Sequence, residues 1–383
     1  MKKRILFVVN ELSFFISHRL NIALAAKKEG YKVKIAYGEV AKKKEKILIQ
    51  KKGIECFEIP LYRNSLNPLR ELWAFFSILY NFYLFKPDIV HLITIKAYLY
   101  GGIAARLVRV PCVVSSIAGL GSFFHRKNLK NLIFKSLVYP IFYLAFRHPN
   151  QYIIVQNLED KKILGNWGVL NFKKVYLIKG SGVELKKFFN LNEKKTIVTV
   201  CFASRLLKDK GVYDFVDAAN LIKKRGLKAR FLLAGSVDLD NPTGLTNREL
   251  NNIRNQQAVE VLGFKKNIAK LYSECHVVCL PSFFGEGIPK ALIEAGAASR
   301  AIVTTNHPGC RDAIIPNKTG ILVPIKNPKK LADAIQWLIE KPKERKKMGK
   351  AGRKLAEKIF PINKISQQHI KIYHALLRNC NLV

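Results

Sequence analysis

Acidic residues are scarce in this chain of 383 residues, which has 27 Asp and Glu against 66 Lys and Arg. The formal net charge of +39 at pH 7 indicates a polyanionic partner, either nucleic acid or an anionic membrane. The window 89–158, 70 residues long, contains no Asp or Glu at all. With 49% hydrophobic and 10% aromatic residues, the chain can still bury a core, which excludes a disordered or fibrous protein.

Long apolar runs are also lacking. The N-terminus begins like a signal peptide, but Asn10 and Glu11 end its apolar run after about six residues, so a first buried β-strand is the better interpretation. The longest later run, 132–146, contains Lys135 and Pro140 and is shorter than the roughly 20 residues that span a bilayer. We therefore expect no signal peptide, no transmembrane helix and a cytoplasmic location.

The cysteines lack the spacing of a disulfide framework or a zinc ribbon. Seven cysteines, an odd number, are scattered along the chain, which favours reduced thiols. Cys275 and Cys279 flank His276, but no second ligand pair follows at zinc spacing, so we expect buried thiols there.

Short aliphatic segments alternate with longer helical patterns along the whole chain. Strands this short and this apolar, separated by helices, are typical of parallel sheets covered on both faces. Two such series predict an α/β protein with two doubly wound, Rossmann-like domains. The expected strands are 5–9, 33–36, 89–92, 112–115, 152–155 and 175–178, then 197–201, 231–234, 259–262, 277–280 and 301–304.

The turn residues 179–182 mark the expected domain boundary. We expect an N-terminal domain over 1–178 and a C-terminal domain over 179–360. A last helical segment, 361–383, is expected to pack back on the N-terminal domain.

The most specific local motif is PSFFGEGIPKALIEAGA, residues 281–297. A strand ends at its start, Glu286 lies in a loop between two glycines, and Pro289 suits the first turn of a helix. Glu294 then lies about one to two turns into that helix. Glycines let a backbone approach a ligand, and free N–H groups at a helix start attract anions. The two carboxylates could bind a polyhydroxyl ligand; a capping Glu286 and a surface Glu294 are the alternative.

A second motif follows the expected strand 197–201. Arg205 and Lys210 lie in the loop and first turn after it, where open α/β sheets place ligand groups. Two cations beside a helix start could hold a diphosphate, Arg through its planar fork and Lys as a point charge. Solvated surface charges are the alternative.

Taken together, these motifs resemble those of the retaining glycosyltransferases of family four, which have the GT-B fold of two domains facing across a cleft. The resemblance covers essentially the whole chain. Its motifs are Arg205-x4-Lys210-Gly211, Leu233-Ala234-Gly235, Leu262-Gly263, Pro281-Ser282, Glu286-x7-Glu294 and the interdomain Gly180-Ser181-Gly182-Val183.

The resemblance implies roles on the donor side. Arg205 and Lys210 would hold the nucleotide diphosphate, Glu294 the ribose hydroxyls, and Glu286 would be a catalytic residue at the donor sugar. The residues implied to line the sugar pocket are Gly285, Gly287, Ile288 and Pro289, with Gly263 and Phe264 beside the base. Neither a metal nor another cofactor is expected, because cations and helix N-termini can stabilise a departing diphosphate.

The N-terminal half is similar to members that extend undecaprenyl-diphosphate-linked or capsular glycans. The segments that carry this similarity are Ser17-His18-Arg19, PDIVH at 87–91 and AGLGSFF at 118–124. We expect His18, also a catalytic candidate, and Arg19 to grip an acceptor phosphate; a packed His beside a helix-start Arg is the alternative. Further acceptor candidates are Asn10, His91 and Gly119. Glu11 and His91, at strand ends facing the expected cleft, could supply a base or orient a loop.

The acid-free window contains FHRKNLKNLIFKSLVYPIFYLAFRH, a basic and aromatic segment. This pattern suits the interface of an anionic leaflet, with a core helix as the alternative. The expected membrane contacts are Arg126, Lys127, Lys130 and Lys135.

The sequence thus favours a retaining glycosyltransferase that moves a sugar from a nucleotide sugar, a UDP-sugar being expected, to a lipid-diphosphate-linked saccharide at the inner face of the cytoplasmic membrane. A nucleotide-sugar epimerase of the same fold is the rival enzyme. The hypothesis of a nucleic-acid-binding protein rests on the net charge alone, because the sequence has no recognisable RNA-binding signature or helix-turn-helix. Asp238 and Asp240 resemble a metal-binding D-x-D pair, but lie in a loop rich in Asp, Asn, Pro and Gly, so we expect no metal there.

Overall fold

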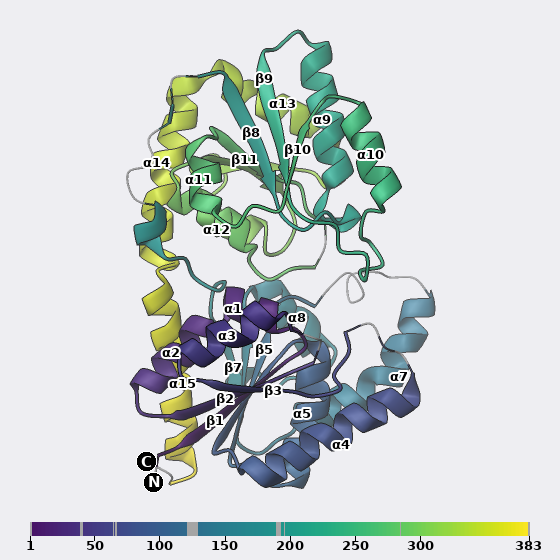
Figure 1. Ribbon diagram of the computed structural model, residues 1–383, viewed down its shortest axis with the longest axis vertical. Coiled ribbons are helices and arrows are strands. Elements are labelled where there is room, and N and C mark those ends of the chain that lie inside the picture. Colours follow the sequence, from purple (N-terminus) through teal and green to yellow (C-terminus); the bar gives the residue numbers. More distant parts are fainter. Residues whose placement is uncertain are drawn as a thin grey trace. The chain divides into compact units, whose positions relative to one another are not determined.

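The computed structural model (Figure 1) describes residues 2–38, 41–63, 65, 67–120, 129–188, 193–194, 196–283 and 285–381, with the backbone alone at 129–134 and 137. The chain forms two compact units, Met1–Ser181 with Asn363–Val383, and Gly182–Ile362. The boundaries expected from the sequence, after 178 and after 360, lie close to these.

The first unit is a seven-stranded parallel sheet in the order β3-β2-β1-β4-β5-β6-β7. Its strands are β1 (Arg4–Val9), β2 (Lys32–Tyr37), β3 (Glu55–Glu58), β4 (Ile89–Ile93), β5 (Cys112–Ile117), β6 (Gln151–Val155) and β7 (Val175–Leu177). Its helices are α1 (Leu12–His18), α2 (Leu20–Lys28), α3 (Lys43–Lys51), α4 (Pro68–Phe85), α5 (Ile95–Leu107), α7 (Leu129–Ala145), α8 (Leu158–Asn166) and α15 (Ile362–Asn379).

Strand β1 shows why both faces of this sheet are covered. Its residues after Arg4 are buried, and alternate side chains enter different cores because successive Cβ atoms point to opposite faces. Phe7 packs with α1, α2 and α15, whereas Leu6 and Val8 pack with α4, α5 and α7. Figure 1 shows these two groups of helices on opposite faces of the sheet.

The second unit is a six-stranded parallel sheet in the order β10-β9-β8-β11-β12-β13. Its strands are β8 (Val198–Ala203), β9 (Ala229–Ala234), β10 (Glu260–Gly263), β11 (Val277–Leu280), β12 (Ala301–Thr305) and β13 (Gly320–Val323). Its helices are α9 (Val212–Lys224), α10 (Asn247–Asn255), α11 (Ile268–Ser273), α12 (Lys290–Ala297), α13 (Pro328–Glu340) and α14 (Pro342–Ile359). The doubly wound α/β prediction is confirmed in both units.

The two passages of the chain between the units lie side by side. Val183 donates its N–H to Phe360 O at 2.8 Å, and Ile362 donates to Val183 O at 3.1 Å. Helix α15 then packs in the first unit, where Leu376 and Tyr373 join the core with Phe7. Among the residues that the structure describes, no helix is long and apolar enough to cross a membrane.

Candidate active site

Each sheet has one place where the strand order reverses, and open α/β sheets bind ligands beyond the carboxyl ends of the strands that flank it. In the second unit these strands are β8 and β11, paired through Val200 and Val277. The loops that follow them carry Arg205, Lys210 and Glu286. The three candidates therefore come from the two loops at the switch point.

Lys210 and Glu286 form an ion pair across these loops, with side chains only 10% and 12% exposed. Ser282 donates its hydroxyl to the same carboxylate, with 2.6 Å between Oγ and Glu286 Oε1. A nearly buried charge pair is screened less than a surface pair, and removing one partner leaves the other charge desolvated. The alternative of a capping Glu286 is wrong, because α12 begins only at Lys290, after an N-cap at Pro289.

Hydrogen bonds to backbone carbonyl groups hold the Glu286 loop in place. Phe283 donates its N–H to Asp209 O at 3.0 Å. Thr305, at the end of β12, donates its hydroxyl to Ser282 O. The Glu286 loop is thus joined to the loop after β8 and to the end of β12. These contacts fix the carboxylate relative to Lys210.

Two glycines permit this close approach. Gly211 has φ +78°, and a Cβ there would lie 2.2 Å from Pro281 O. Gly309 has φ +80°, and a Cβ there would lie 2.0 Å from Gly287 O. Both positions demand left-handed backbone and leave no space for a side chain, so the Glu286 loop lies between two glycine contacts.

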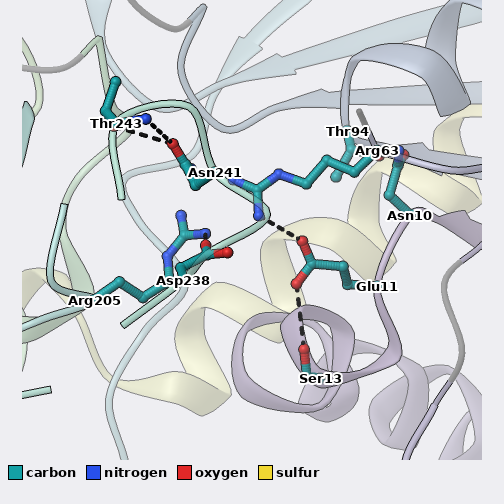
Figure 2. A network of polar contacts seen from close by, with 9 residues as sticks. All are labelled: Asn10, Glu11, Ser13, Arg63, Thr94, Arg205, Asp238, Asn241 and Thr243. Atoms are coloured by element: carbon teal, nitrogen blue, oxygen red, sulfur yellow. Dashed lines mark hydrogen bonds and ion pairs between the residues drawn. The ribbon is translucent and has the colours of Figure 1, made fainter. Parts of the chain in front are cut away.

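Arg205 lies further out than Lys210. Its Nη1 donates to Asp238 Oδ2 at 2.8 Å, and its side chain is 45% exposed (Figure 2). The loop that carries Asp238 is braced within itself, because Thr243 donates both its N–H and its hydroxyl to Asn241 Oδ1 at 3.0 Å. An arginine has five N–H donors, so Asp238 can orient this guanidinium while other donors bind a ligand.

Glu294 lies on α12, one turn after Lys290, and the distance between Lys290 Nζ and Glu294 Oε1 is 3.6 Å. Burial raises the pKa of the Glu294 carboxyl, and Lys290 opposes that rise. Its side chain is only 16% exposed, so the alternative of a surface residue is wrong. Pro289 is the N-cap of α12 rather than a residue of its first turn.

The other donor-side candidates differ in exposure. Gly285 and Gly287 are in the Glu286 loop, whereas Ile288 is buried in the core of the second unit. Gly263 ends β10 with φ +65°, and Phe264 after it is 74% exposed. An aromatic ring that exposed at a strand's carboxyl end can stack on a flat ligand.

The first unit has its own switch point, between β1 and β4. Thr94, directly after β4, donates its hydroxyl to Asn10 Oδ1, directly after β1. Thr94 has φ +81°, which is strained for a β-branched residue and is found at functional sites. Asn10 therefore lies where an open α/β sheet binds ligands.

Glu11 follows Asn10 and contacts Arg63, with 2.9 Å between Arg63 Nη1 and Glu11 Oε1 (Figure 2). Ser13 donates its hydroxyl to the other carboxylate oxygen at 3.4 Å. Both carboxylate oxygens of Glu11 are thus engaged by neighbouring side chains, so the contacts favour loop orientation over proton transfer.

Two acceptor candidates do not lie at an accessible edge. His91 is the third of five residues in β4, not a strand end, and is fully buried. Its Nδ1 lies 2.6 Å from the Tyr373 hydroxyl and its Nε2 2.6 Å from Ser116 Oγ. Arg19 is only 2% exposed, and burial lowers its pKa to about 10. The expectations that His91 faces a cleft and that Arg19 grips a phosphate are wrong, because helix α15 covers that face of the sheet.

His18 is half-buried at the end of α1, where its ring stacks on Phe14 with 4.4 Å between centroids. Gly119 lies after β5 with φ +104°. Of the expected membrane contacts, Arg126 and Lys127 lie outside the described residues. Lys130 is in the first turn of α7, where only the backbone is described, and Lys135 is half-buried on that helix.

The two cysteines beside His276 lie in the core of the second unit. Cys275 and Cys279 are buried free thiols, as expected. His276 accepts the Thr199 N–H at 3.0 Å and lies 3.0 Å from Lys194 O through its other ring nitrogen. Within the described ranges, no group of three or more His, Cys, Asp or Glu is arranged to hold a metal ion.

Sequence reasoning missed a half-buried lysine beside the first switch point. Lys96, in the first turn of α5, places its Nζ 2.8 Å from Tyr62 O and 2.7 Å from Glu71 Oε1. Tyr100 donates its hydroxyl to the other Glu71 oxygen at 2.6 Å. These contacts join α4 to α5; the only signal was a single lysine in an apolar helix. Ser282 was named in a motif without a role and Thr305 was not singled out, because both roles depend on neighbouring strands.

Comparison with known proteins agrees with this geometry. Residues 183–355 match the family described as glycosyl transferases group 1, and residues 4–157 match the family described as glycosyl transferase 4-like. A crystallised glycosyltransferase from Rickettsia africae superposes with a TM-score of 0.78 at 21% identity, covering 99% of both chains. That likeness concerns the fold, and the predicted GT-B fold is confirmed.

Two relatives carry more specific names. The N,N'-diacetylbacillosaminyl-diphospho-undecaprenol alpha-1,3-N-acetylgalactosaminyltransferase of Campylobacter jejuni is 31% identical over 342 residues, 85% of this chain and 87% of its own length. The UDP-Gal:alpha-D-GlcNAc-diphosphoundecaprenol alpha-1,3-galactosyltransferase of Escherichia coli is 26% identical and covers 67% of each chain. Because both units match glycosyl transferase families and a relative above 30% identity spans most of its length, this chain belongs to the GT-B glycosyltransferases of the group 1 and 4-like families.

Proposed function

We propose that this glycosyltransferase moves a sugar from a UDP-sugar, with retention of anomeric configuration, to a saccharide linked through diphosphate to undecaprenol. The acceptor belongs to cell-surface glycan synthesis. The observation that carries the proposal is the Lys210–Glu286 pair at the switch point of the second sheet. The names of the two relatives support the donor and acceptor classes.

The donor diphosphate binds at the loop after β8. Lys210 precedes the N-terminus of α9, and its 3-10 turn, Lys208–Lys210, ends at the left-handed Gly211. Helix N-termini carry partial positive charge, so the α9 amides and Lys210 favour the same anion. Arg205, oriented by Asp238, adds a second cation with several free donor directions. No metal is required for this arrangement, because the side chains supply the positive charge.

The reaction exchanges one bond for another at the anomeric carbon. The bond from C1 to the diphosphate oxygen breaks, and the electron pair goes to the leaving group. The bond from the acceptor hydroxyl to C1 forms, and the hydroxyl proton passes to a base on the acceptor side, for which His18 is the candidate. Arg205 and Lys210 stabilise the negative charge that develops on the leaving diphosphate.

The two carboxylates of the 281–297 motif have separate tasks. Glu286 contacts the donor sugar, and binding of the diphosphate to Lys210 frees it from part of its ion pair. Glu294 accepts hydrogen bonds from the ribose hydroxyls. Its raised pKa reflects burial, which hydroxyl donors offset by stabilising the ionised form.

The acceptor diphosphate is a lipid headgroup, so the enzyme works at the inner face of the cytoplasmic membrane. Asn10 and Thr94 mark the switch point of the first unit, which receives the acceptor saccharide. The basic segment 126–135 contributes attraction to the anionic leaflet.

The experiment is a transfer assay with a panel of UDP-sugars and undecaprenyl-diphosphate-linked saccharides. The expected product is the acceptor enlarged by one sugar. NMR of the new glycosidic linkage should show the same anomeric configuration as in the donor. Conversion of a UDP-sugar into its epimer without growth of an acceptor would instead establish the epimerase.

A further inference from the structure

Helix α4 presents a row of large apolar side chains to the outside of the first unit. Seven of them are between 53% and 77% exposed. They recur at the helical repeat over about 22 Å of helix, at 1.5 Å per residue. We call them the outer face of α4: Leu69, Leu72, Trp73, Phe76, Tyr80, Tyr83 and Leu84.

The fold of the unit does not require these residues. The opposite side of α4 supplies its core contacts through Ala74, Ile78 and Phe82, which are buried. Between Leu72 and Phe85 the helix has no charged residue. A helix that is apolar all round is normally buried, and a contiguous exposed apolar surface marks an interaction site.

The charges around the outer face are positive. Arg70 in the first turn and Lys86 at the C-cap are exposed. The only acid of the helix, Glu71, is engaged by Lys96 and Tyr100. The helices α5 and α7, which cover the same face of the sheet as α4 (Figure 1), lie in the acid-free window 89–158.

Helix α7 also presents exposed apolar and basic side chains. Tyr143 and Leu144 are exposed on it, and the guanidinium of Arg147 lies 4.2 Å from the centre of the Tyr143 ring. Aromatic rings with a polar atom, leucines and flanking cations are the residues that occupy the interface of an anionic bilayer. A second copy of this chain fits less well, because each copy carries a net charge of +39.

We propose that the outer face of α4 docks on an anionic lipid bilayer. Trp73, Phe76 and Tyr80 enter the headgroup region, while Arg70 and Lys86 meet lipid phosphates. This surface is additional to the basic segment 126–135. It requires neither the donor site nor an acceptor, so it goes beyond the proposed function and can be tested without either.

The test is sedimentation of the whole protein with vesicles of phosphatidylcholine, with or without phosphatidylglycerol and free of any glycolipid. The variant replaces Trp73, Phe76 and Tyr80 together by Gln, a good helix former. The matched control replaces three exposed apolar residues of the second unit by Gln: Ile197, Ile325 and Trp337. We expect at least about tenfold weaker binding to anionic vesicles for the α4 variant, and unchanged binding for the control.

A second readout follows insertion directly. The chain has three tryptophans, so Trp167→Phe with Trp337→Phe leaves Trp73 as the only reporter. Its emission should move to shorter wavelength on adding anionic vesicles and be quenched by brominated lipid. Circular dichroism and calorimetric UDP binding should match the wild type in the Gln variant, which shows that both units are folded.

Two outcomes would overturn the proposal. One is full binding of the α4 variant to anionic vesicles together with unchanged Trp73 emission in the Trp167→Phe, Trp337→Phe reporter protein. The other is a wild-type dimer in light scattering that becomes monomeric in the α4 variant while neither protein binds vesicles, which would make the outer face a self-association surface. Failure of UDP binding in the wild type would count against the proposed function alone.

Discussion

Lys210, in the 3-10 turn after β8, forms its ion pair with Glu286, in the loop after β11. The two residues are far apart in sequence and meet because β8 and β11 are neighbours at the switch point of a parallel sheet. Under the proposed function, the pair places a cation for the leaving diphosphate beside a carboxylate for the sugar. The first three predictions below depend on this arrangement.

Replacing Arg205 or Lys210 by Ala should weaken UDP binding, measured by calorimetry, by about 10- to 100-fold. Each change removes charge-assisted hydrogen bonds that are worth about 1.5–3 kcal/mol. The control is Arg230→Ala, because Arg230 forms a comparable exposed ion pair with Glu260 at 2.8 Å. Unchanged affinity in both site variants would exclude the diphosphate assignment.

Replacing Glu286 by Gln should reduce turnover by at least about tenfold while UDP affinity stays near that of the wild type. The reason is that Glu286 is assigned to the sugar, which UDP lacks. Glu294→Gln should do the reverse and weaken UDP binding, since Glu294 is assigned to the ribose. If Glu286→Gln instead weakens UDP binding and Glu294→Gln lowers turnover, the roles of the two carboxylates are the reverse of those assigned.

Activity should survive a chelator. In the proposed function Arg205 and Lys210 provide the positive charge at the diphosphate, so EDTA is expected to leave the transfer rate unchanged. Asp238→Asn should retain most activity for the same reason, with some loss because Asp238 orients Arg205. Abolition by EDTA with rescue by Mn²⁺ would return Asp238 and Asp240 to consideration as metal ligands.

The buried His369 predicts an acid-sensitive first unit. Burial, with the charge of Arg19 adding to it, lowers the pKa of His369 from 6.5 to about 3. Between those values the unfolded chain binds a proton that the folded unit does not, so the free energy of unfolding falls as pH drops from 6.5 toward 3. The contribution is about 1.4 kcal/mol per pH unit.

Urea unfolding of the wild type and of His369→Gln at a series of pH values checks this dependence. The variant should show a shallower decline, and His91, His148 and His276, whose pKa values burial also lowers, should contribute to the remaining slope. His374→Gln on the same helix, at an exposed position, is the matched control. Equal slopes in all three proteins would contradict the assignment.

Much of the fold could be predicted because buried parallel strands are continuous apolar runs. Strand β3, Glu55–Glu58, was missed because it is a polar edge strand, with Glu55 held by Lys34 at 2.6 Å. Strand β13 was missed because Gly320, at its start, is a residue type that predicts a turn rather than a strand. Its place is set by pairing with β12.

The candidate site was partly predictable for a similar reason. Loop motifs such as Glu286-x7-Glu294 are local, so their residue types and spacing are visible in the sequence. The burial of Arg19 and His91 was not visible, because α15 covers them with residues distant in sequence, such as Tyr373, 282 positions from His91. The exposed face of α4 was hidden as well, since an apolar helix is ordinarily a buried one.

The most direct measurement of the central claim is mass spectrometry of an undecaprenyl-diphosphate-linked saccharide after incubation with the enzyme and each UDP-sugar. The account predicts that, with one donor, the acceptor gains the mass of one sugar and UDP is released in equal amount. Lys210→Ala should lose this product at donor concentrations that saturate the wild type. Donor turnover without any gain in acceptor mass, across the whole panel, would contradict the account.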